Sequence, residues 1–197
     1  SLFGPPDEPM PSLKWALFAS VIDYTLTDKS GILNFSNRQF LDGILLGMPE
    51  NEENDVRRNL VHFFQMNASS DRDIAERPWH LVKLEDWLAL ETLLTDPEYF
   101  PQLFEHHAYD AKIFWQQLEN SGAVKIPQAY SPLLTNPENF SHKNVKAVAE
   151  LFFDKSYFQS AKKLYDYLKD FRLGDDLAET IKHWRRSAHV LYMTGFL

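Results

Sequence analysis

The chain has 197 residues, of which 44% are hydrophobic and 24% charged, so its composition is that of a globular protein and excludes a disordered or collagen-like chain. A formal net charge of -8 disfavours non-specific binding to nucleic acid, which depends on neutralising phosphates. The absence of cysteine excludes disulfides, thiol nucleophiles and cysteine-ligated zinc, and it fits a reducing, cytoplasmic location.

The N-terminal segment begins with residues 1–11, which hold four of the 11 prolines and predict an extended lead-in without a signal peptide. Apolar residues at helical spacing then predict a helix that begins near Leu13 and is ended by residues 28–31. The short apolar run at 32–35 could form a strand, and a second helix follows it through Leu45.

The next segment contains an acidic polar loop at 49–54 and a predicted helix over 55–66. Asp71 is placed to cap another helix, in which Pro78 predicts a kink or a start. Further helices are predicted over 85–95, 98–106 and 109–120, the last of them ended by Ser121-Gly122.

The segment 125–140 contains three prolines and is the best candidate for an internal joint. Strong helical patterns follow it at 141–153, 157–171 and 175–192. The predicted fold is therefore all-α, with antiparallel helix pairs stacked into a superhelix.

The last third of the chain resembles a tetratricopeptide (TPR) repeat. Small and aromatic residues follow the spacing of that repeat at Val145, Val148, Ala149, Phe152, Ser156, Phe158, Ala161, Tyr165 and Leu168. In such repeats the small residues let two helices approach closely, and the aromatic residues fill the space beside them. Ser156 stands where the repeat has glycine, and Leu173 stands where it has proline. Residues 141–197 are therefore expected to form TPR-like repeats, the last of which stops in mid-repeat at Leu197.

Two motifs in the region 71–124 carry a second resemblance. They are Arg77-Pro78-Trp79-His80-Leu81-Val82-Lys83 with Asp86-Trp87, and Leu93-Leu94-Thr95-Asp96-Pro97-Glu98-Tyr99-Phe100. They are similar to segments of STAND-type ATPases, the large signalling NTPases with NACHT or NB-ARC modules that include the nephrocystins and the NACHT–WD-repeat proteins. Upstream, residues 31–40 resemble the final strand and helix of a winged helix. The resemblance implies a winged-helix-like segment over 12–70, followed by the helical arm.

The ATPase module that this family would carry is absent from the sequence. A phosphate-binding loop needs a Gly-Lys pair followed by Ser or Thr, and no Gly-Lys pair occurs among the 7 glycines. The resemblance implies that the module would lie N-terminal to residue 1 and that the chain is a fragment of a longer protein. We therefore expect no catalytic residue, no cofactor-binding residue and no cofactor in this chain.

For each candidate metal-binding or catalytic side chain, a structural role is favoured over a chemical one. His106-His107 lacks a third ligand at a recognisable spacing, so surface histidines are favoured over a metal site. His80 is expected to pack or to hydrogen-bond at a helix end. The acidic clusters at 50–55 and 175–176 are expected to be solvated rather than paired across a cleft.

The sequence leaves three functions open. The first is a non-catalytic scaffold for protein partners, with no membrane contact, in which Tyr130, Tyr157 and Tyr167 are candidate partner-binding residues. The second is a winged helix that binds nucleic acid, which the mixture of Arg38 and Gln39 with apolar and acidic neighbours disfavours. The third is an unrelated helical enzyme whose site converges only in three dimensions.

Overall fold

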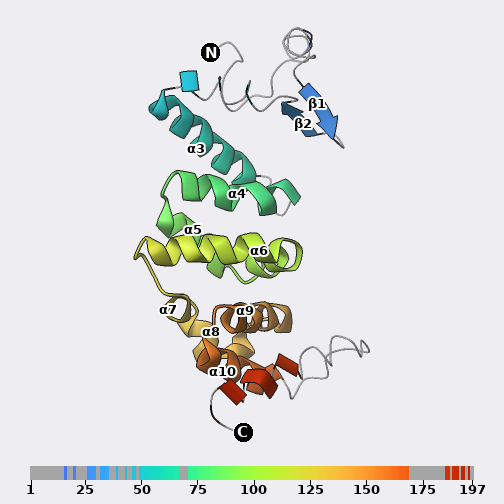
Figure 1. Cartoon of the computed structure of the whole chain (residues 1–197), viewed down its shortest axis with the longest axis vertical. Helices are drawn as coiled ribbons and strands as arrows, with labels where there is room; N and C mark the ends of the chain where they lie inside the picture. Colours follow the sequence, from blue (N-terminus) through green and yellow to red (C-terminus); the bar gives the residue numbers. More distant parts are fainter. Residues whose placement is uncertain are drawn as a thin grey trace. The chain divides into compact units, whose positions relative to one another are not determined.

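A computed structural model describes residues 16, 20, 26–29, 32–35, 39, 43, 46, 47, 49–66, 71–168 and eight positions between 185 and 195. Contacts divide the chain into two compact units, residues 1–60 and 61–197. Figure 1 shows that the described elements are helices, apart from one pair of short strands. The expected helical fold is thus confirmed for most of the described residues.

A small antiparallel hairpin is the exception to the helical fold. Strand β1 (Leu26–Lys29) pairs with β2 (Ile32–Phe35), with Leu26 opposite Phe35 and Lys29 opposite Ile32. The strand at 32–35 is therefore confirmed, whereas Leu26–Lys29 was expected to end a helix. Pairing with β2 provides the backbone partners that so short a segment lacks by itself. The predicted helix that begins near Leu13 lies almost wholly outside the described residues.

Helix α3 (Glu50–Met66) begins five residues before its predicted start at 55. The acidic run that indicated a loop instead occupies the first turn, where Glu50, Glu52 and Glu53 lie. The backbone N–H groups of Glu52 and Glu53 both donate to the carbonyl of Pro49. Carboxylates are favourable at a helix N-terminus because of its partial positive charge, so the loop prediction was wrong for a definable reason.

Helix α4 (Asp71–Lys83) runs through Pro78 without ending there. Proline has no N–H, so the carbonyl of Ile74, four residues earlier, loses its helical partner. The buried hydroxyl of Tyr99 reaches this gap: it lies 3.4 Å from the Ile74 carbonyl, and it also donates to the carbonyl of Asp73 at 3.0 Å. A contact 25 residues away in sequence therefore allows the helix to continue.

Replacing Tyr99 with phenylalanine is expected to lower the free energy of unfolding by about 1–3 kcal/mol, because it leaves the carbonyl of buried Ile74 without a donor. Urea unfolding followed by circular dichroism measures the change. Tyr109→Phe is the matched control, since Tyr109 is 73% exposed and its loss should change little. Equal unfolding midpoints for the Tyr99 and Tyr109 variants would contradict this role of the hydroxyl.

The next helices are α5 (Trp87–Thr95) and α6 (Tyr99–Asn120), each with an aspartate at its start. Asp86 accepts from the N–H of Ala89, and Asp96 accepts from the N–H of Tyr99. Helix α6 is interrupted at His107, whose backbone is non-helical (φ -137, ψ 45). The sequence predicted two helices here, and this kink falls between them.

The proline-containing joint is a succession of short turns of helix. These are α7 (Ile126–Ala129), α8 (Ser131–Thr135) and the 3-10 turn η2 (Pro137–Asn139), each with proline in its first turn. Proline is favourable there because its fixed φ suits a helix start and its missing N–H has no helical partner at that position.

A helix pair follows the joint, formed by α9 (His142–Asp154) and α10 (Phe158–Leu168). Ser141 caps α9 by accepting from the N–H of Asn144, as expected of a serine before a helix. The buried positions of the pair include most of the repeat-like ones, namely Val145, Val148, Ala149, Phe152, Ala161, Tyr165 and Leu168. Most of the helix predicted over 175–192 lies outside the described residues.

A left-handed residue reverses the chain between α9 and α10. Ser156, at the position of the repeat's glycine, has φ 62. Its N–H donates to the carbonyl of Phe153, and the N–H of Tyr157 donates to that of Phe152 at 2.8 Å. The rings of Phe152 and Tyr157 lie 6.1 Å apart, which completes the Schellman arrangement of a helix C-terminus.

Ser156→Gly is expected to raise the free energy of unfolding by about 0.5–1 kcal/mol, because glycine adopts positive φ without steric cost. Thermal unfolding provides the measurement. Ser160→Gly is the control, because the same change within helix α10 should destabilise the protein. If both variants lose stability, the strain attributed to Ser156 is absent.

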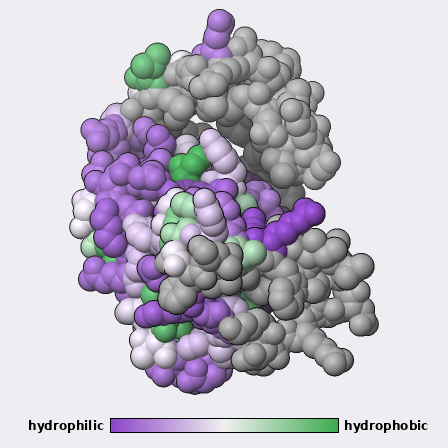
Figure 2. All heavy atoms as spheres, turned by 60° about the horizontal axis from the view of Figure 1, so that its bottom comes forward, coloured by the Kyte–Doolittle hydropathy of each residue, from purple (hydrophilic) through white to green (hydrophobic). Residues whose placement is uncertain are grey.

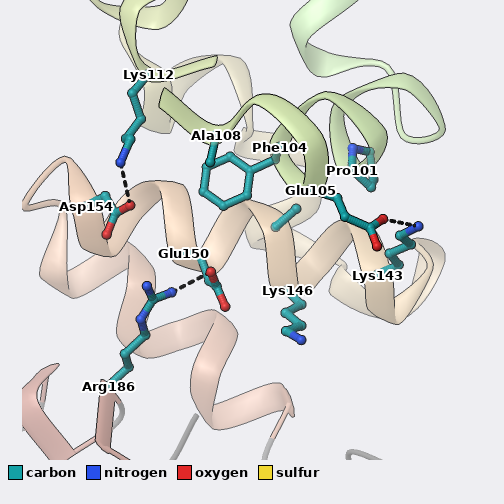
Figure 3. A pocket seen from close by; sticks show the side chains of 11 residues that line it. Pro101, Phe104, Glu105, Ala108, Lys112, Lys143, Lys146, Glu150, Asp154 and Arg186 are labelled. Atoms are coloured by element: carbon teal, nitrogen blue, oxygen red, sulfur yellow. Dashed lines mark hydrogen bonds and ion pairs between the residues drawn. The ribbon is translucent and has the colours of Figure 1, made fainter. Parts of the chain in front are cut away.

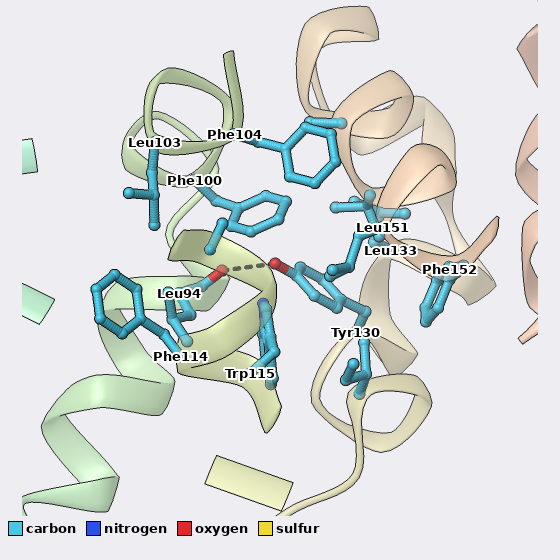
Figure 4. Close-up of a cluster of buried hydrophobic side chains, with 14 of the residues drawn as sticks. Leu94, Phe100, Leu103, Phe104, Phe114, Trp115, Tyr130, Leu133, Leu151 and Phe152 are labelled. Carbon is cyan, nitrogen blue, oxygen red and sulfur yellow. Dashed lines mark hydrogen bonds between the residues drawn. The ribbon is translucent and has the colours of Figure 1, made fainter. Parts of the chain in front are cut away.

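The core of the 61–197 unit contains an aromatic cluster where several helices meet (Figure 4). The Tyr130 ring lies 5.4 Å from Trp115 and 6.0 Å from Phe152, centre to centre. Its hydroxyl donates to the carbonyl of Leu94 at 2.5 Å. The high aromatic content of the sequence is thus used to join α5, α6 and α9.

The surface shown in Figure 2 is largely hydrophilic, with apolar side chains in separate spots. Large apolar residues that are exposed include Leu88, Met66 and Tyr109. Among the residues that the structure describes, no helix combines the length and the apolar character needed to cross a bilayer.

Candidate functional site

A groove of about 570 Å³ lies between α6 and α9 in the 61–197 unit, and we call it the α6–α9 groove (Figure 3). Residues at offsets 0, 3, 4, 7 and 11 line it from each helix. They are Pro101, Phe104, Glu105, Ala108 and Lys112 of α6, and Lys143, Lys146, Ala147, Glu150 and Asp154 of α9. These offsets define one face of a helix, so the groove is built from two matching faces.

Ion pairs across the α6–α9 groove show that the two helices run in the same direction. Near its start, Lys143 lies 2.7 Å from Glu105, and near its end, Lys112 lies 3.2 Å from Asp154. The earlier residue of α6 thus pairs with the earlier residue of α9, and the later residue with the later one. Equivalent helices of successive repeats are parallel in this way, since each is separated from the next by a returning helix.

Arg186 extends the same surface beyond α9. Its guanidinium lies 2.5 Å from Glu150, and the His189 ring lies 5.5 Å from that of Phe153. Residues later in α9 thus contact residues later in 185–193, so the two segments run in the same direction. The described part of 185–193 therefore continues the pattern begun by α6 and α9.

Charge in the α6–α9 groove is mixed and largely paired. Four of its lining residues are basic and three are acidic, in a chain whose net charge is -8. Lys143 lowers the pKa of Glu105, first through its hydrogen bond and then through its charge. Buried Phe104 and Ala147 supply an apolar floor. Such a surface suits a peptide that presents both apolar and charged side chains.

Two further hydrogen bonds join α6 to the end of α9. Lys155 donates to the side-chain carbonyl of Gln116 at 2.8 Å, and the Tyr157 hydroxyl donates to Glu119 at 2.6 Å. Burial raises the pKa of Tyr157 to about 12, and the bond to the Glu119 carboxylate acts in the same direction. The neutral phenol is therefore the form that the folded state favours.

The stability of the protein is expected to fall as pH rises from about 10 through 12. A phenol with an ordinary pKa of about 10 loses its proton in the unfolded chain first, so the contribution of Tyr157 is complete below pH 10 and is lost as pH rises to about 12. Urea unfolding at several pH values measures this slope. Tyr157→Phe should make the decline shallower, and an unchanged slope would contradict the assignment.

The three tyrosines proposed as partner-binding residues occupy different environments. Tyr130 is only 3% exposed, and this burial favours a packing role over the expected partner-binding role. Tyr157 is half-buried between Glu119 and Phe152, away from the residues that line the α6–α9 groove. Tyr167 is half-buried with its ring 6.3 Å from that of His142. Partner binding by these last two stays a prediction.

The described histidines that were considered as functional residues lie in packing or surface positions. His80 is buried and stacks on Phe64 at 6.1 Å, which agrees with the packing interpretation. His106 and His107 border a separate hollow with Asp71 and Ile74. Within the described residues, no group of three metal-ligating side chains occurs.

The two sequence motifs of the region 71–124 meet in space around α4 and α6. The guanidinium of Arg77, from the first motif, lies 4.8 Å from the ring centre of Tyr99, from the second. Arg77 also forms a buried ion pair with Asp73, at 2.7 Å. The residues that carry the resemblance thus hold the helices together, and they do not line the α6–α9 groove.

The lining of the α6–α9 groove was missed by the sequence analysis. The shared offsets of 0, 3, 4, 7 and 11 were a usable signal, since both faces combine small or apolar residues with charged ones. Charged residues in helices are mostly solvated, however, so the pattern gains meaning only when the two helices are known to be neighbours.

Comparison with curated proteins finds a similarity to a repeat protein. The chain is 23% identical over 116 residues to a TPR repeat-containing protein of Dictyostelium discoideum. The match covers 54% of this chain and 7% of that much longer protein. No family model and no solved structure matches the chain. The match and the helical fold together fit a TPR-like helical arm.

Proposed function

We propose that the chain is a non-catalytic helical scaffold that binds a protein partner in the α6–α9 groove. The observation that carries this proposal is the pair of matching helix faces, which run parallel and join apolar and charged residues in one groove. The similarity to a TPR repeat-containing protein supports it, because repeat arrays offer extended surfaces to peptides. A cytoplasmic location is part of the proposal.

A charge exchange across the α6–α9 groove tests the proposal. The double variant Lys112→Asp/Asp154→Lys keeps an ion pair but reverses its polarity on the two helices. Peptides selected from a random 12-residue library on the natural protein are expected to bind this variant at least tenfold more weakly. The control is Lys162→Asp/Asp166→Lys, which exchanges a pair within α10. Failure to select any peptide, or equal binding by natural protein and double variant, would refute the proposal.

The absence of catalysis is tested separately by titration with ATP. We expect neither saturable binding at micromolar ATP nor turnover. Binding accompanied by release of phosphate would overturn the non-catalytic assignment.

We further propose that the arm belongs to a STAND-type signalling ATPase, with a winged-helix-like segment at its N-terminal end. The order of the sequence motifs supports this, as does a short hairpin, β1–β2, in the region where the winged helix is expected. The complete coding sequence is the test. A phosphate-binding loop upstream would support the assignment, and an open reading frame without one would contradict it.

A further inference from the structure

A second hollow in the 61–197 unit lies along α5 and is distinct from the α6–α9 groove. It has a volume of about 700 Å³, and we call it the α5 groove. Its apolar lining comes from α4, α5 and α6, in Leu81, Leu88, Ala89, Leu93 and Tyr99. Leu88 is 76% exposed, although its neighbours Leu90 and Leu94 are fully buried in the core. Helix α5 therefore presents apolar side chains on a second side.

The accessible charge around the α5 groove is all of one sign. Asp86, Asp96 and Glu98 are exposed lining residues. The one basic side chain among the described lining residues, Arg77, is buried and pairs with buried Asp73. The α5 groove therefore attracts positive charge, whereas the α6–α9 groove carries both signs.

Local structure fixes the positions of two of these acids. Asp86 accepts from the N–H of Ala89 at the start of α5, and Asp96 accepts from two N–H groups at the start of α6. Each cap holds a carboxylate at one end of α5. Ten residues at a rise of about 1.5 Å place the two about 15 Å apart. A partner helix with basic residues at the same spacing matches both ends.

We propose that the α5 groove binds a basic amphipathic helix, which places an apolar face against Leu88 and Leu93 and basic side chains near Asp86 and Asp96. Charge complementarity carries the choice of partner. Exposed Leu88 supplies the apolar contact that charge alone would not give. This inference is independent of the α6–α9 groove and adds a second docking surface of different chemistry.

Two synthetic helical peptides of 16 residues test the inference. They share one apolar stripe and differ only at positions 3 and 13, which are lysine in the first peptide and glutamate in the second. Fluorescence anisotropy is expected to show at least tenfold tighter binding of the lysine peptide. Raising the salt concentration from 50 to 300 mM should weaken this binding, because exposed charges are screened. No binding of the lysine peptide, or equal binding of the two, would overturn the inference.

Protein variants locate the contact. Asp86→Asn/Asp96→Asn/Glu98→Gln removes the charge of the rim, while asparagine still caps helices as aspartate does. We expect the preference for the lysine peptide to vanish in this variant and to survive in Glu50→Gln/Glu52→Gln/Glu138→Gln, which removes as many charges elsewhere. Leu88→Asp should abolish binding without unfolding the protein, since Leu88 is exposed. Unchanged binding in the rim variant would contradict the inference.

The alternative occupants give different outcomes. If only Lys112→Asp/Asp154→Lys loses binding of the lysine peptide, the peptide binds in the α6–α9 groove. That outcome would support the proposed function and refute this inference. Self-association that sedimentation detects and Leu88→Asp removes would assign the α5 groove to a second copy of the chain.

Discussion

Arg77→Met is expected to lower the free energy of unfolding by about 3–5 kcal/mol, one of the two largest effects predicted for this protein. Arg77 is 9% exposed and Asp73 is fully buried, with Nε and Oδ1 2.7 Å apart. A second bond joins Nη2 to Oδ2 at 3.1 Å. Removing the guanidinium takes the opposite charge from beside a buried carboxylate and a cation from above the Tyr99 ring. Urea unfolding measures the loss.

The double variant Asp73→Leu/Arg77→Met removes both buried charges together. It therefore tests whether the ion pair itself stabilises the fold. Because burying two charges costs about as much as their attraction returns, the double variant should lie within about 1 kcal/mol of the natural protein. A double variant as unstable as Arg77→Met alone would show that the ion pair itself stabilises the fold. The Arg72–Glu76 pair on the same helix is a control, since it is exposed and Arg72→Met should cost under about 1 kcal/mol.

Tyr130→Ala is expected to cost about 3–5 kcal/mol, because it opens a cavity between α5, α6 and α9. The Tyr130 ring contacts Phe100, Trp115 and Phe152 in one cluster (Figure 4). Tyr130→Phe keeps the ring and removes only the hydrogen bond to Leu94, so about 1 kcal/mol is expected. Thermal unfolding of both variants gives the comparison.

The Tyr130→Phe variant also distinguishes packing from partner binding at this residue. A packing role predicts that peptide affinity in the α6–α9 groove is unchanged in Tyr130→Phe, which stays folded. A tenfold loss of affinity with unchanged stability would instead restore a partner-binding role for this residue.

Sequence periodicity was sufficient to predict most helices of the 61–197 unit, because their buried faces repeat every three to four residues. It failed where a local rule was overridden. The acidic run at 49–54 indicated a loop, yet carboxylates stabilise a helix start. Pro78 indicated a kink or a helix start, yet α4 runs through it, and the distant hydroxyl of Tyr99 lies 3.4 Å from the Ile74 carbonyl that the proline leaves free. The contact with Tyr99 is not visible in the sequence around Pro78.

The candidate sites were harder to predict than the helices. Tyr130 was chosen because aromatic residues on repeat arrays often face a partner, but its neighbours in space are Trp115 and Phe152. The α6–α9 groove brings together residues about 42 positions apart, as in Lys112 and Asp154. Only the packing of α6 against α9 reveals that their charged faces oppose each other.

The hydrogen bonds that join α9 and its loop to earlier helices also have a mechanical consequence. They link residues 38 to 47 positions apart, as in Tyr157 with Glu119 and Asn144 with Pro97. Each helix layer is thus tied mainly to the adjacent one, and few contacts bind distant layers to each other. Under tension applied along the stack, we expect such a chain to yield layer by layer rather than all at once.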